Sequence, residues 1–298
     1  RPPDVLRTTS VGLLVGGDLS GVQDFIYTVA PRGATSALRG RSFYLQLLTE
    51  ALARYVLREL GLPITNVIYQ GGGNFYLLVP PDAVEKLGDI RRYVSDVLWR
   101  HHAGDLYLAL AWQSLSAVDL CSGRIGEAWE ALGQQQQRAK QRRFAETPAT
   151  LAGLFEPLEH GGNEETQCSV CGREHSDIER IETVRKCRPC RAYEALGKDL
   201  RRARYLTLES IGARRAPDAG AWDAILGELG LRASVSAAPP NRTGEWRVLL
   251  ALDDQALSEL RPATGTAIGR RFVVNVTLII TRKEIEALAD RVEDLPTE

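Results

Sequence analysis

Alternating runs of apolar and polar residues along the first 115 positions predict a regular set of strands and helices. Short apolar stretches rich in β-branched and aromatic residues are typical of strands, and apolar residues at three- and four-residue spacing are typical of helices. Strands are predicted at 11–18, 64–70, 75–80 and 106–112, and helices at 37–60 and 81–102. The order β-α-β-β-α-β indicates a ferredoxin-like α+β domain, in which an antiparallel sheet carries both helices on one face.

Glycine and proline mark the breaks between these elements. The sequence Gly71–Gly72–Gly73–Asn74 separates two predicted strands and favours a β-hairpin turn. A helix-prone stretch that begins near Ser20 is interrupted at Pro31–Gly33, and Gly61–Pro63 ends the long helix.

The rest of the chain is less regular. Residues 123–147 predict a polar helix, rich in glutamine and arginine, that acts as a spacer. Further strands are predicted at 205–210, 246–252 and 272–280, and a helical tail from Lys283. The expected domains are a palm-like domain at 1–115, a helical linker at 116–159, a zinc module at 160–204 and a mixed α/β segment at 205–298 that leads toward a second palm.

Composition excludes several classes of protein. The formal charge is −1 and no apolar run approaches the roughly 20 residues that span a bilayer, so neither wholesale nucleic-acid binding nor a membrane span is expected. No secretory signal begins the sequence, and we expect a soluble intracellular protein. The sequence contains no methionine, which favours a fragment of a longer protein. Basic clusters at 138–143, 185–191 and 201–204 could touch phosphates or be solvated helix faces.

Four of the five cysteines form two close pairs, Cys168-x-x-Cys171 and Cys187-x-x-Cys190, separated by 15 residues. Each pair directs two thiolates to one point, and two pairs supply the four sulfurs that tetrahedral zinc prefers. A closed four-sulfur site has no open position for substrate, so we expect structural Zn²⁺. His175 is surplus to such a site.

Palm domains of polymerases and nucleotidyl cyclases hold two divalent cations with carboxylates at the end of the first strand and in the hairpin between the second and third. Asp18 occupies the first place, but the hairpin carries Asn74 and no carboxylate. Its glycines still allow close approach of a phosphate or base. The sequence therefore predicts a site that holds a nucleotide and is poorly equipped to react it. Asp18 could instead cap the following helix.

Three ordered motifs and the cysteine pairs carry a family resemblance. They are GDLSGVQDFIYTV (17–29), LRGRSFYLQLL (38–48) and YQGGGNFYLLVP (69–80). Over about residues 1–200 the chain resembles the large palm-containing subunit of type III CRISPR effector complexes. The resemblance implies a cytoplasmic prokaryotic protein of an antiviral ribonucleoprotein complex, with other subunits as partners and indirect contact with guide and target RNA.

The family has two palms. A GGDD hairpin in the second palm converts ATP into cyclic oligoadenylate, and many members also have a DNA-cutting HD domain. This sequence contains neither GGDD nor an adjacent His-Asp pair, so no catalytic residue is assigned. The resemblance implies a non-catalytic half of an ATP site, with Mg²⁺ or Mn²⁺ supplied by the partner palm. The residues implied in nucleotide binding are Asp18, Leu19, Ser20, Gly21, Gln23, Arg39, Ser42, Gly71, Gly72, Gly73 and Asn74.

Alternatives remain at this stage. Phe43 could be a core residue, and Gly40 only a turn glycine. The whole chain could be an architectural zinc module that braces other subunits or RNA. A stand-alone palm enzyme that forms homodimers is a third hypothesis, which Asn74 disfavours because each protomer would lack the hairpin carboxylate.

Overall fold

The computed structural model describes residues 4–121, 123–147, 163–181, 183–211, 221–239, 247–261 and 265–271. The helices and strands up to residue 147 are α1 (Asp4–Thr8), β1 (Ser10–Ser20), α2 (Val22–Tyr27), α3 (Ala34–Leu60), η1 (Ile64–Asn66), β2 (Val67–Gly71), β3 (Asn74–Val79), η2 (Pro81–Ala83), α4 (Val84–His102), β4 (Tyr107–Ser116), α5 (Ala117–Cys121) and α6 (Ile125–Gln141). They are followed by η3 (Glu164–Thr166), β5 (Glu179–Ile181), β6 (Val184–Lys186), α8 (Arg188–Asp199), β7 (Tyr205–Ser210), α9 (Ala224–Glu228), β8 (Leu231–Ser236), β9 (Arg247–Ala251), α10 (Asp254–Glu259) and β10 (Thr266–Arg270).

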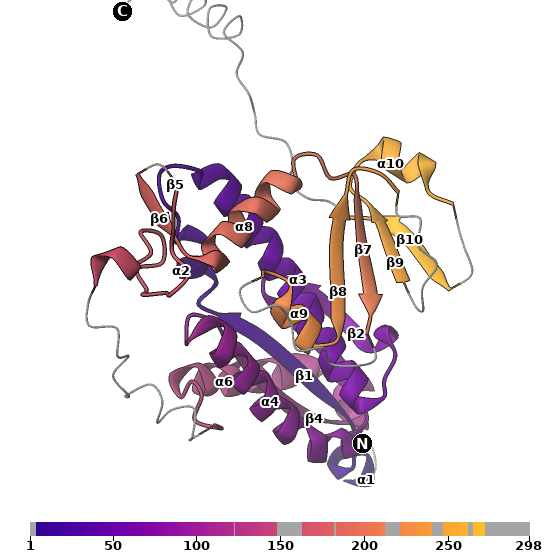
Figure 1. The fold of residues 1–298 in the computed structure, drawn as a ribbon. Helices are drawn as coiled ribbons and strands as arrows, with labels where there is room; N and C mark the ends of the chain where they lie inside the picture. Colours follow the sequence, from indigo (N-terminus) through magenta and orange to yellow (C-terminus); the bar gives the residue numbers. More distant parts are fainter. Residues whose placement is uncertain are drawn as a thin grey trace, which may run out of the picture.

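The first sheet has the strand order β2-β3-β1-β4, and every neighbouring pair is antiparallel (Figure 1). On one face, Leu13 and Val15 of β1 join the core that α3 and α4 complete. On the other face, Leu14 packs with Leu132 of α6. Because side chains alternate along a strand, β1 supplies apolar residues to both faces and is buried along most of its length.

The adjacent glycines of β1 fit this central position. A Cβ on Gly17 would lie 2.2 Å from the Phe75 ring, and one on Gly16 would lie 2.9 Å from a methyl carbon of Leu132. Each glycine therefore leaves room for a large side chain on its own face of the sheet. The Gly-Gly-Asp sequence lies inside β1, in agreement with the strand predicted at 11–18.

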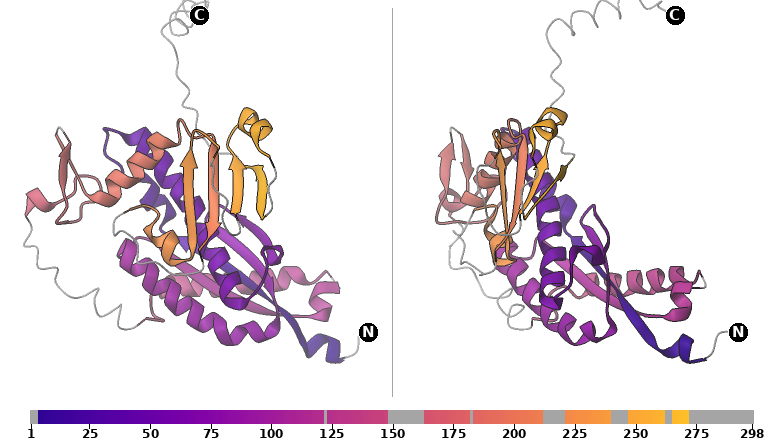
Figure 2. Two further views of the ribbon diagram at one scale, coloured as in Figure 1. Left: turned by 45° about the vertical axis from the view of Figure 1, so that its right-hand side comes forward. Right: turned by 90° about the vertical axis from the view of Figure 1, so that its right-hand side faces the viewer.

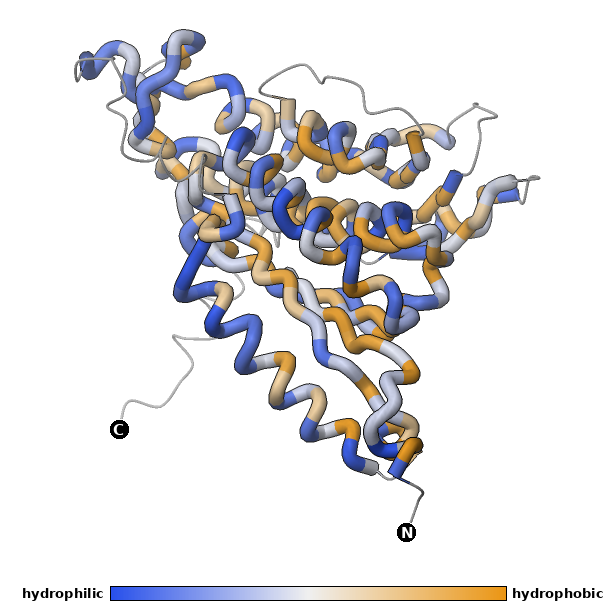
Figure 3. The backbone as a smooth tube through the Cα atoms, turned by 90° about the horizontal axis from the view of Figure 1, so that it is seen from below, coloured by the Kyte–Doolittle hydropathy of each residue, from blue (hydrophilic) through white to orange (hydrophobic). Residues whose placement is uncertain are grey.

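Helix α6, predicted as a spacer, covers the second face of this sheet. Leu132 is fully buried, and Trp129 makes an edge contact with Tyr76 of β3. Apolar residues recur along the helix among polar ones (Figure 3). The polar composition of 123–147 hid this packing, because a few apolar residues on one face are enough to dock a helix.

The long helix α3 contacts the first sheet, α8 and α9. Residue Gly61 ends it in the left-handed conformation, with φ of 69°, as the sequence predicted. Helix α8 crosses α3, and the hairpin β5-β6 lies beyond it, away from the first sheet (Figures 1 and 2). Phe43, for which a position in the core was left open by the sequence, is buried there at 3% exposure.

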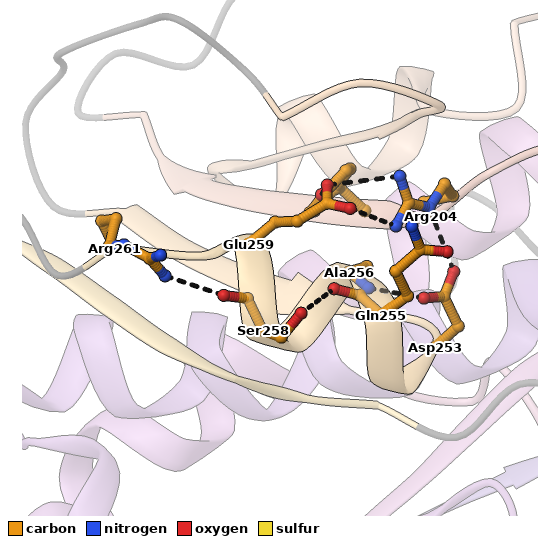
Figure 4. Close-up of polar contacts among 8 residues, drawn as sticks. Arg204, Asp253, Gln255, Ala256, Ser258, Glu259 and Arg261 are labelled. Atoms are coloured by element: carbon orange, nitrogen blue, oxygen red, sulfur yellow. Dashed lines mark hydrogen bonds and ion pairs between the residues drawn. The ribbon is translucent and has the colours of Figure 1, made fainter.

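A second four-stranded sheet has the order β10-β9-β7-β8, with β9 and β10 parallel and the other pairs antiparallel (Figure 2). Arg204, just before β7, holds α10 through Glu259 and Asp253 (Figure 4). Asp253 also caps α10, because its carboxylate accepts a hydrogen bond of 2.6 Å from the Ala256 amide.

The two sheets share one core. Leu206 and Leu208 of β7, with Leu226 of α9, belong to the same buried cluster as α3 and α4. Arg271, after β10, forms an ion pair of 2.6 Å with Glu50 of α3. The described residues between 205 and 271 are thus packed on the first part of the chain.

The predicted strands at 205–210 and 246–252 correspond to β7 and β9 and are confirmed, whereas β8 and β10 were missed. The strand predicted at 272–280, the tail from Lys283 and residues 148–162 lie outside the described residues. Within the described part of the chain, no helix has the length and apolar character needed to cross a bilayer.

Candidate nucleotide and metal sites

The structure brings the first-strand motif and the glycine turn together. Asp18 pairs with Asn74 across β1 and β3, and the Leu19 amide donates a hydrogen bond of 2.9 Å to the Gly73 carbonyl. Gly72 and Gly73 both have positive φ, 61° and 85°, so they form the two-residue turn that glycine favours. Six of the predicted residues therefore lie at one end of the sheet: Asp18, Leu19, Gly71, Gly72, Gly73 and Asn74.

Asp18 is held by a lysine that sequence reasoning did not assign. Its carboxylate forms an ion pair of 2.5 Å with Lys140 at the end of α6, and both side chains are about one-quarter exposed. Asp18 does not cap α2, whose N-cap is Gly21 without a side-chain hydrogen bond. The signal for Lys140 was the basic cluster at 138–143, but nothing in the sequence linked that cluster to Asp18.

The residues after Asp18 have separate roles. Ser20 donates a hydrogen bond of 3.3 Å to the Tyr107 carbonyl of β4. Gly21 has φ of 88°, and a Cβ there would lie 1.8 Å from the Asp105 carbonyl oxygen, so only glycine fits. Gln23 is exposed on α2. This segment thus turns sharply against the loop that precedes β4.

Two of the predicted nucleotide-binding residues, Arg39 and Ser42, lie on α3, and Arg39 also contacts α8. Arg39 donates to the Gly197 carbonyl of α8 at 3.1 Å, and burial followed by the charge of Arg201 lowers its pKa. Ser42 is half-buried one turn further along the helix. Gly40, considered as a turn glycine, lies instead inside α3, where a Cβ would meet the Tyr193 carbonyl oxygen of α8 at 1.8 Å.

The four paired cysteines form a compact cluster. Their sulfur atoms all lie within 4.8 Å of one another, and Cys171 Sγ is 3.8 Å from Cys187 Sγ. Zinc–sulfur bonds of about 2.3 Å in a tetrahedron place neighbouring sulfurs about 3.8 Å apart, so the donor set fits a tetrahedral ion. A disulfide would need about 2.05 Å. Cys121 is exposed and stands outside this group.

Local structure directs the sulfurs inward. The first pair lies in a turn in which the Gly172 amide donates to the Cys168 carbonyl, while the Cys187 amide donates to Cys168 Sγ at 3.3 Å. Cys187 caps α8 and Cys190 lies in its first turn, where the helix dipole favours negative charge. Hydrogen bonds among the four thiols lower the pKa of Cys168 and raise the pKa of Cys190, so the sulfurs act as one coupled group. His175 lies 3.6 Å from Cys171 Sγ, beside the four-sulfur set.

Two arginines that the sequence analysis did not single out dock this cysteine module. Arg173, next to the first pair, donates to the His102 carbonyl at 3.0 Å and to the Asp105 carboxylate at 2.5 Å. Arg41 of α3 donates to Cys190 Sγ at 3.3 Å. Arg41 lies inside the 38–48 motif but was given no role there, and no sequence signal marks Arg173, because each acts on a segment far away in the chain.

His102 gives a prediction about pH. It is buried, lies 2.7 Å from the Tyr44 hydroxyl, and burial lowers its pKa to about 3. The unfolded chain, with a His pKa of about 6.5, takes up a proton that the folded chain does not, so stability should fall as pH decreases from about 6.5 toward 3. Between pH 7 and 5, wild type should lose about 2 kcal/mol more stability than His102→Gln. Urea unfolding at both pH values measures this, and parallel losses in the two proteins would contradict it.

A pocket of about 390 Å³ lies between the end of α3 and the second sheet. Its lining includes Arg54, Arg58 and Leu231, but none of the predicted nucleotide-binding residues. The predicted nucleotide-binding residues therefore lie outside this pocket.

Fold and sites together define an α+β protein in which an antiparallel sheet with a glycine turn is docked onto a four-cysteine metal module. Residues 11–157 match the family model of the Csm1 subunit domain B. Over these residues the chain belongs to the Csm1 domain B family, which agrees with the resemblance to large subunits of type III CRISPR effector complexes.

The similar curated proteins are each described as a CRISPR system single-strand-specific deoxyribonuclease Cas10/Csm1 of subtype III-A. The protein of Thermococcus onnurineus is 40% identical over 171 residues, which is 54% of this chain and 21% of the relative. The protein of Methanocaldococcus jannaschii is 32% identical over 201 residues, which is 61% of this chain and 24% of the relative. The protein of Mycobacterium tuberculosis is 32% identical over 226 residues, which is 71% of this chain and 28% of the relative. The chain thus spans about a quarter of the length of these relatives.

Solved structures share the fold. A Csm1-Csm4 cassette in complex with one ATP has a TM-score of 0.62 at 24% identity, over 92% of this chain and 32% of that chain. A Csm1-Csm4 subcomplex of the type III-A CRISPR-Csm interference complex has a TM-score of 0.61 at 25% identity. The match covers 89% of this chain and 30% of that chain. The likeness extends beyond the residues that match the domain B model.

Proposed function

We propose that this chain is the part of a type III CRISPR large subunit that supplies the non-catalytic half of an ATP-binding site. In this proposal residues 1–115 form a ferredoxin-like palm, and a second palm with a GGDD hairpin completes the site and makes cyclic oligoadenylate. The second palm also supplies Mg²⁺ or Mn²⁺. The complex is a cytoplasmic antiviral ribonucleoprotein that is guided by RNA.

The observation that carries the proposal is the contact between β1 and the glycine turn. The Leu19 amide bonds to the Gly73 carbonyl, which sets Asp18 beside Asn74 at the end of the sheet. A Cβ on Gly72 would meet nothing within 4 Å, so the turn presents open backbone to a ligand. Backbone of this kind can approach a phosphate closely.

The same geometry supports binding rather than catalysis by this half. The turn carries Asn74, a neutral side chain, and Asp18 is already paired with Lys140. Two-metal phosphoryl transfer needs carboxylates that hold the cations, and here one carboxylate faces an ammonium. Lys140 can in turn offer its charge to a phosphate.

The partners follow from the relatives. The similar structures contain a Csm4 subunit and, in separate complexes, ATP or cA4. We infer the same classes of partner here: an adjacent protein subunit, ATP, and guide and target RNA through the assembled complex. The ion of the four-cysteine group is proposed to be structural Zn²⁺, since four thiolates with this spacing suit it.

Calorimetric titration of the purified protein with ATP and Mg²⁺, together with chromatography of the products, tests the proposal. Binding without product is expected, and addition of a GGDD palm subunit should then yield oligoadenylate. Oligoadenylate made by this chain alone would show that Asp18 and its neighbours are catalytic. No binding in millimolar ATP would favour the architectural alternative, which the extensive docking of the cysteine module also supports.

Lys140→Ala should weaken ATP binding about tenfold, because a charge-assisted contact with phosphate is lost. Lys86→Ala is the matched control: Lys86 is exposed on α4, which follows the opposite end of β3 from the glycine turn. Its removal changes the net charge equally and should leave affinity unchanged. Titration calorimetry compares the two variants, and equal affinities would place the phosphates away from Lys140.

A further inference from the structure

Arg41 lies between the four-cysteine cluster and α2, the short helix within the 17–29 motif. Its side chain is buried at 3% exposure. One terminal nitrogen donates to Cys190 Sγ at 3.3 Å, and the other donates to the Phe25 carbonyl of α2 at 3.0 Å. A single guanidinium thus contacts two segments that are 165 residues apart in the sequence.

The surroundings of Arg41 leave the sulfur cluster as its counter-charge. The guanidinium carbon lies 4.7 Å from the Phe25 ring centre and 4.9 Å from that of Tyr193. Among the described residues, no carboxylate forms an ion pair with Arg41. Asp105 lies close enough for the charge of Arg41 to act on its carboxyl group, but its ion pair is with Arg173. A buried guanidinium stays charged and is costly without compensation.

A metal-loaded cluster would supply that compensation. Four thiolates around a divalent ion carry a net charge of about −2, and hydrogen bonds to the sulfurs stabilise this charge. Two backbone amides already donate to Cys168 Sγ, those of Val170 at 3.4 Å and Cys187 at 3.3 Å. Cys190 instead receives its hydrogen bond from a side chain that belongs to another part of the fold.

The other end of the bridge is the last turn of α2. This helix has only six residues, and carbonyls in the last turn of a helix have no partner within it. Arg41 satisfies the Phe25 carbonyl, while the Phe25 amide donates to Gly21 at 2.9 Å. The position of α2 is therefore linked directly to Gly21, one of the predicted nucleotide-binding residues of the 17–29 motif.

We propose that Arg41 is a positioning residue that couples metal occupancy of the four-cysteine site to the order of α2. The bound ion fixes the guanidinium through Cys190, and the guanidinium fixes α2 through Phe25. Arg173 makes a parallel connection from the first cysteine pair to the loop against Gly21. The coupling does not depend on whether the chain binds ATP.

The first test is metal affinity. Competition of Zn²⁺ with a chromophoric chelator should show a dissociation constant 10- to 100-fold higher for Arg41→Gln, the range expected when an outer partner of a metal ligand is lost. Arg191→Gln is the matched control, because Arg191 is next to Cys190 but pairs with Glu179. In Co²⁺-loaded protein, the thiolate-to-cobalt absorption band should shift in Arg41→Gln and stay in place in Arg191→Gln. Unchanged affinity and an unshifted band would overturn the proposal.

The second test needs no variant and covers the case in which Arg41→Gln fails to fold. Hydrogen exchange of the wild-type chain is measured with and without Zn²⁺, and peptides covering 22–28 are compared with those of α4 and β4. Metal removal should speed exchange at 22–28 at least tenfold while α4 and β4 keep their protection. No change at 22–28, or an equal loss of protection throughout α4 and β4, would overturn the proposal.

Discussion

Cys190→Ser should abolish metal binding and disorder residues 163–187, the part of the cysteine module that precedes α8. The elements of this module before α8 are three residues long each, and its apolar cluster consists largely of the cysteines themselves. A segment with so small a core depends on the metal for its folding free energy, which is about 10–16 kcal/mol for structural zinc in isolated peptides. No other change to this chain is expected to have a larger effect on local structure.

Elemental analysis and limited proteolysis measure this result. The variant should hold no stoichiometric zinc and should be cleaved rapidly between residues 163 and 187, whereas the first sheet should stay protected because its core is independent of the cysteines. Cys121→Ser is the matched control, since Cys121 is exposed and outside the cluster. Full zinc content in Cys190→Ser would show that the four sulfurs are not the ligand set.

Gly40→Val should destabilise the protein by more than about 3 kcal/mol and separate α8 from α3. A Cβ at Gly40 would lie 1.8 Å from the Tyr193 carbonyl oxygen, and one at Gly197 would lie 1.8 Å from the Ser36 carbonyl oxygen. Both obstacles are helix backbone, which cannot rotate away as a side chain can. The helices must move apart, and Tyr193, Leu196 and Arg41 then lose their burial.

Urea unfolding followed by circular dichroism measures the loss. Gly88→Ala, on the exposed side of α4, is the control, because a Cβ there would meet nothing within 4 Å. Alanine is favoured over glycine within a helix, so this variant should gain up to about 1 kcal/mol. If Gly40→Val unfolded at the wild-type midpoint, the close helix crossing would be wrong.

Local rules account for the elements that the sequence predicted well. The turn at Gly72 and Gly73 follows from two glycines between alternating apolar runs, and the end of α3 follows from Gly61 and Pro63. The four-cysteine cluster follows from spacing, because two Cys-x-x-Cys turns have few other uses in a chain of this composition. The family resemblance rested on the same ordered motifs.

The errors have physical reasons. Helix 123–147 was interpreted as a spacer because its mean composition is polar, yet Leu132 and Trp129 dock it on the sheet. Strand β8 was missed although apolar and polar residues alternate along Leu231–Ser236, and β10 was missed because its five residues are largely exposed. Their pairing depends on neighbours that only the folded chain provides.

By itself, the sequence determined the four strands of the first sheet, the two long helices between them, the hairpin turn and the four-cysteine cluster. Each of these is encoded within a few adjacent residues or in a fixed spacing. Only the tertiary structure decided that Lys140 faces Asp18, that Gly40 meets α8 and that Arg41 joins Cys190 to Phe25. These contacts join segments more than about 120 residues apart in the sequence. No local pattern records which of many lysines, arginines or glycines will meet a given partner.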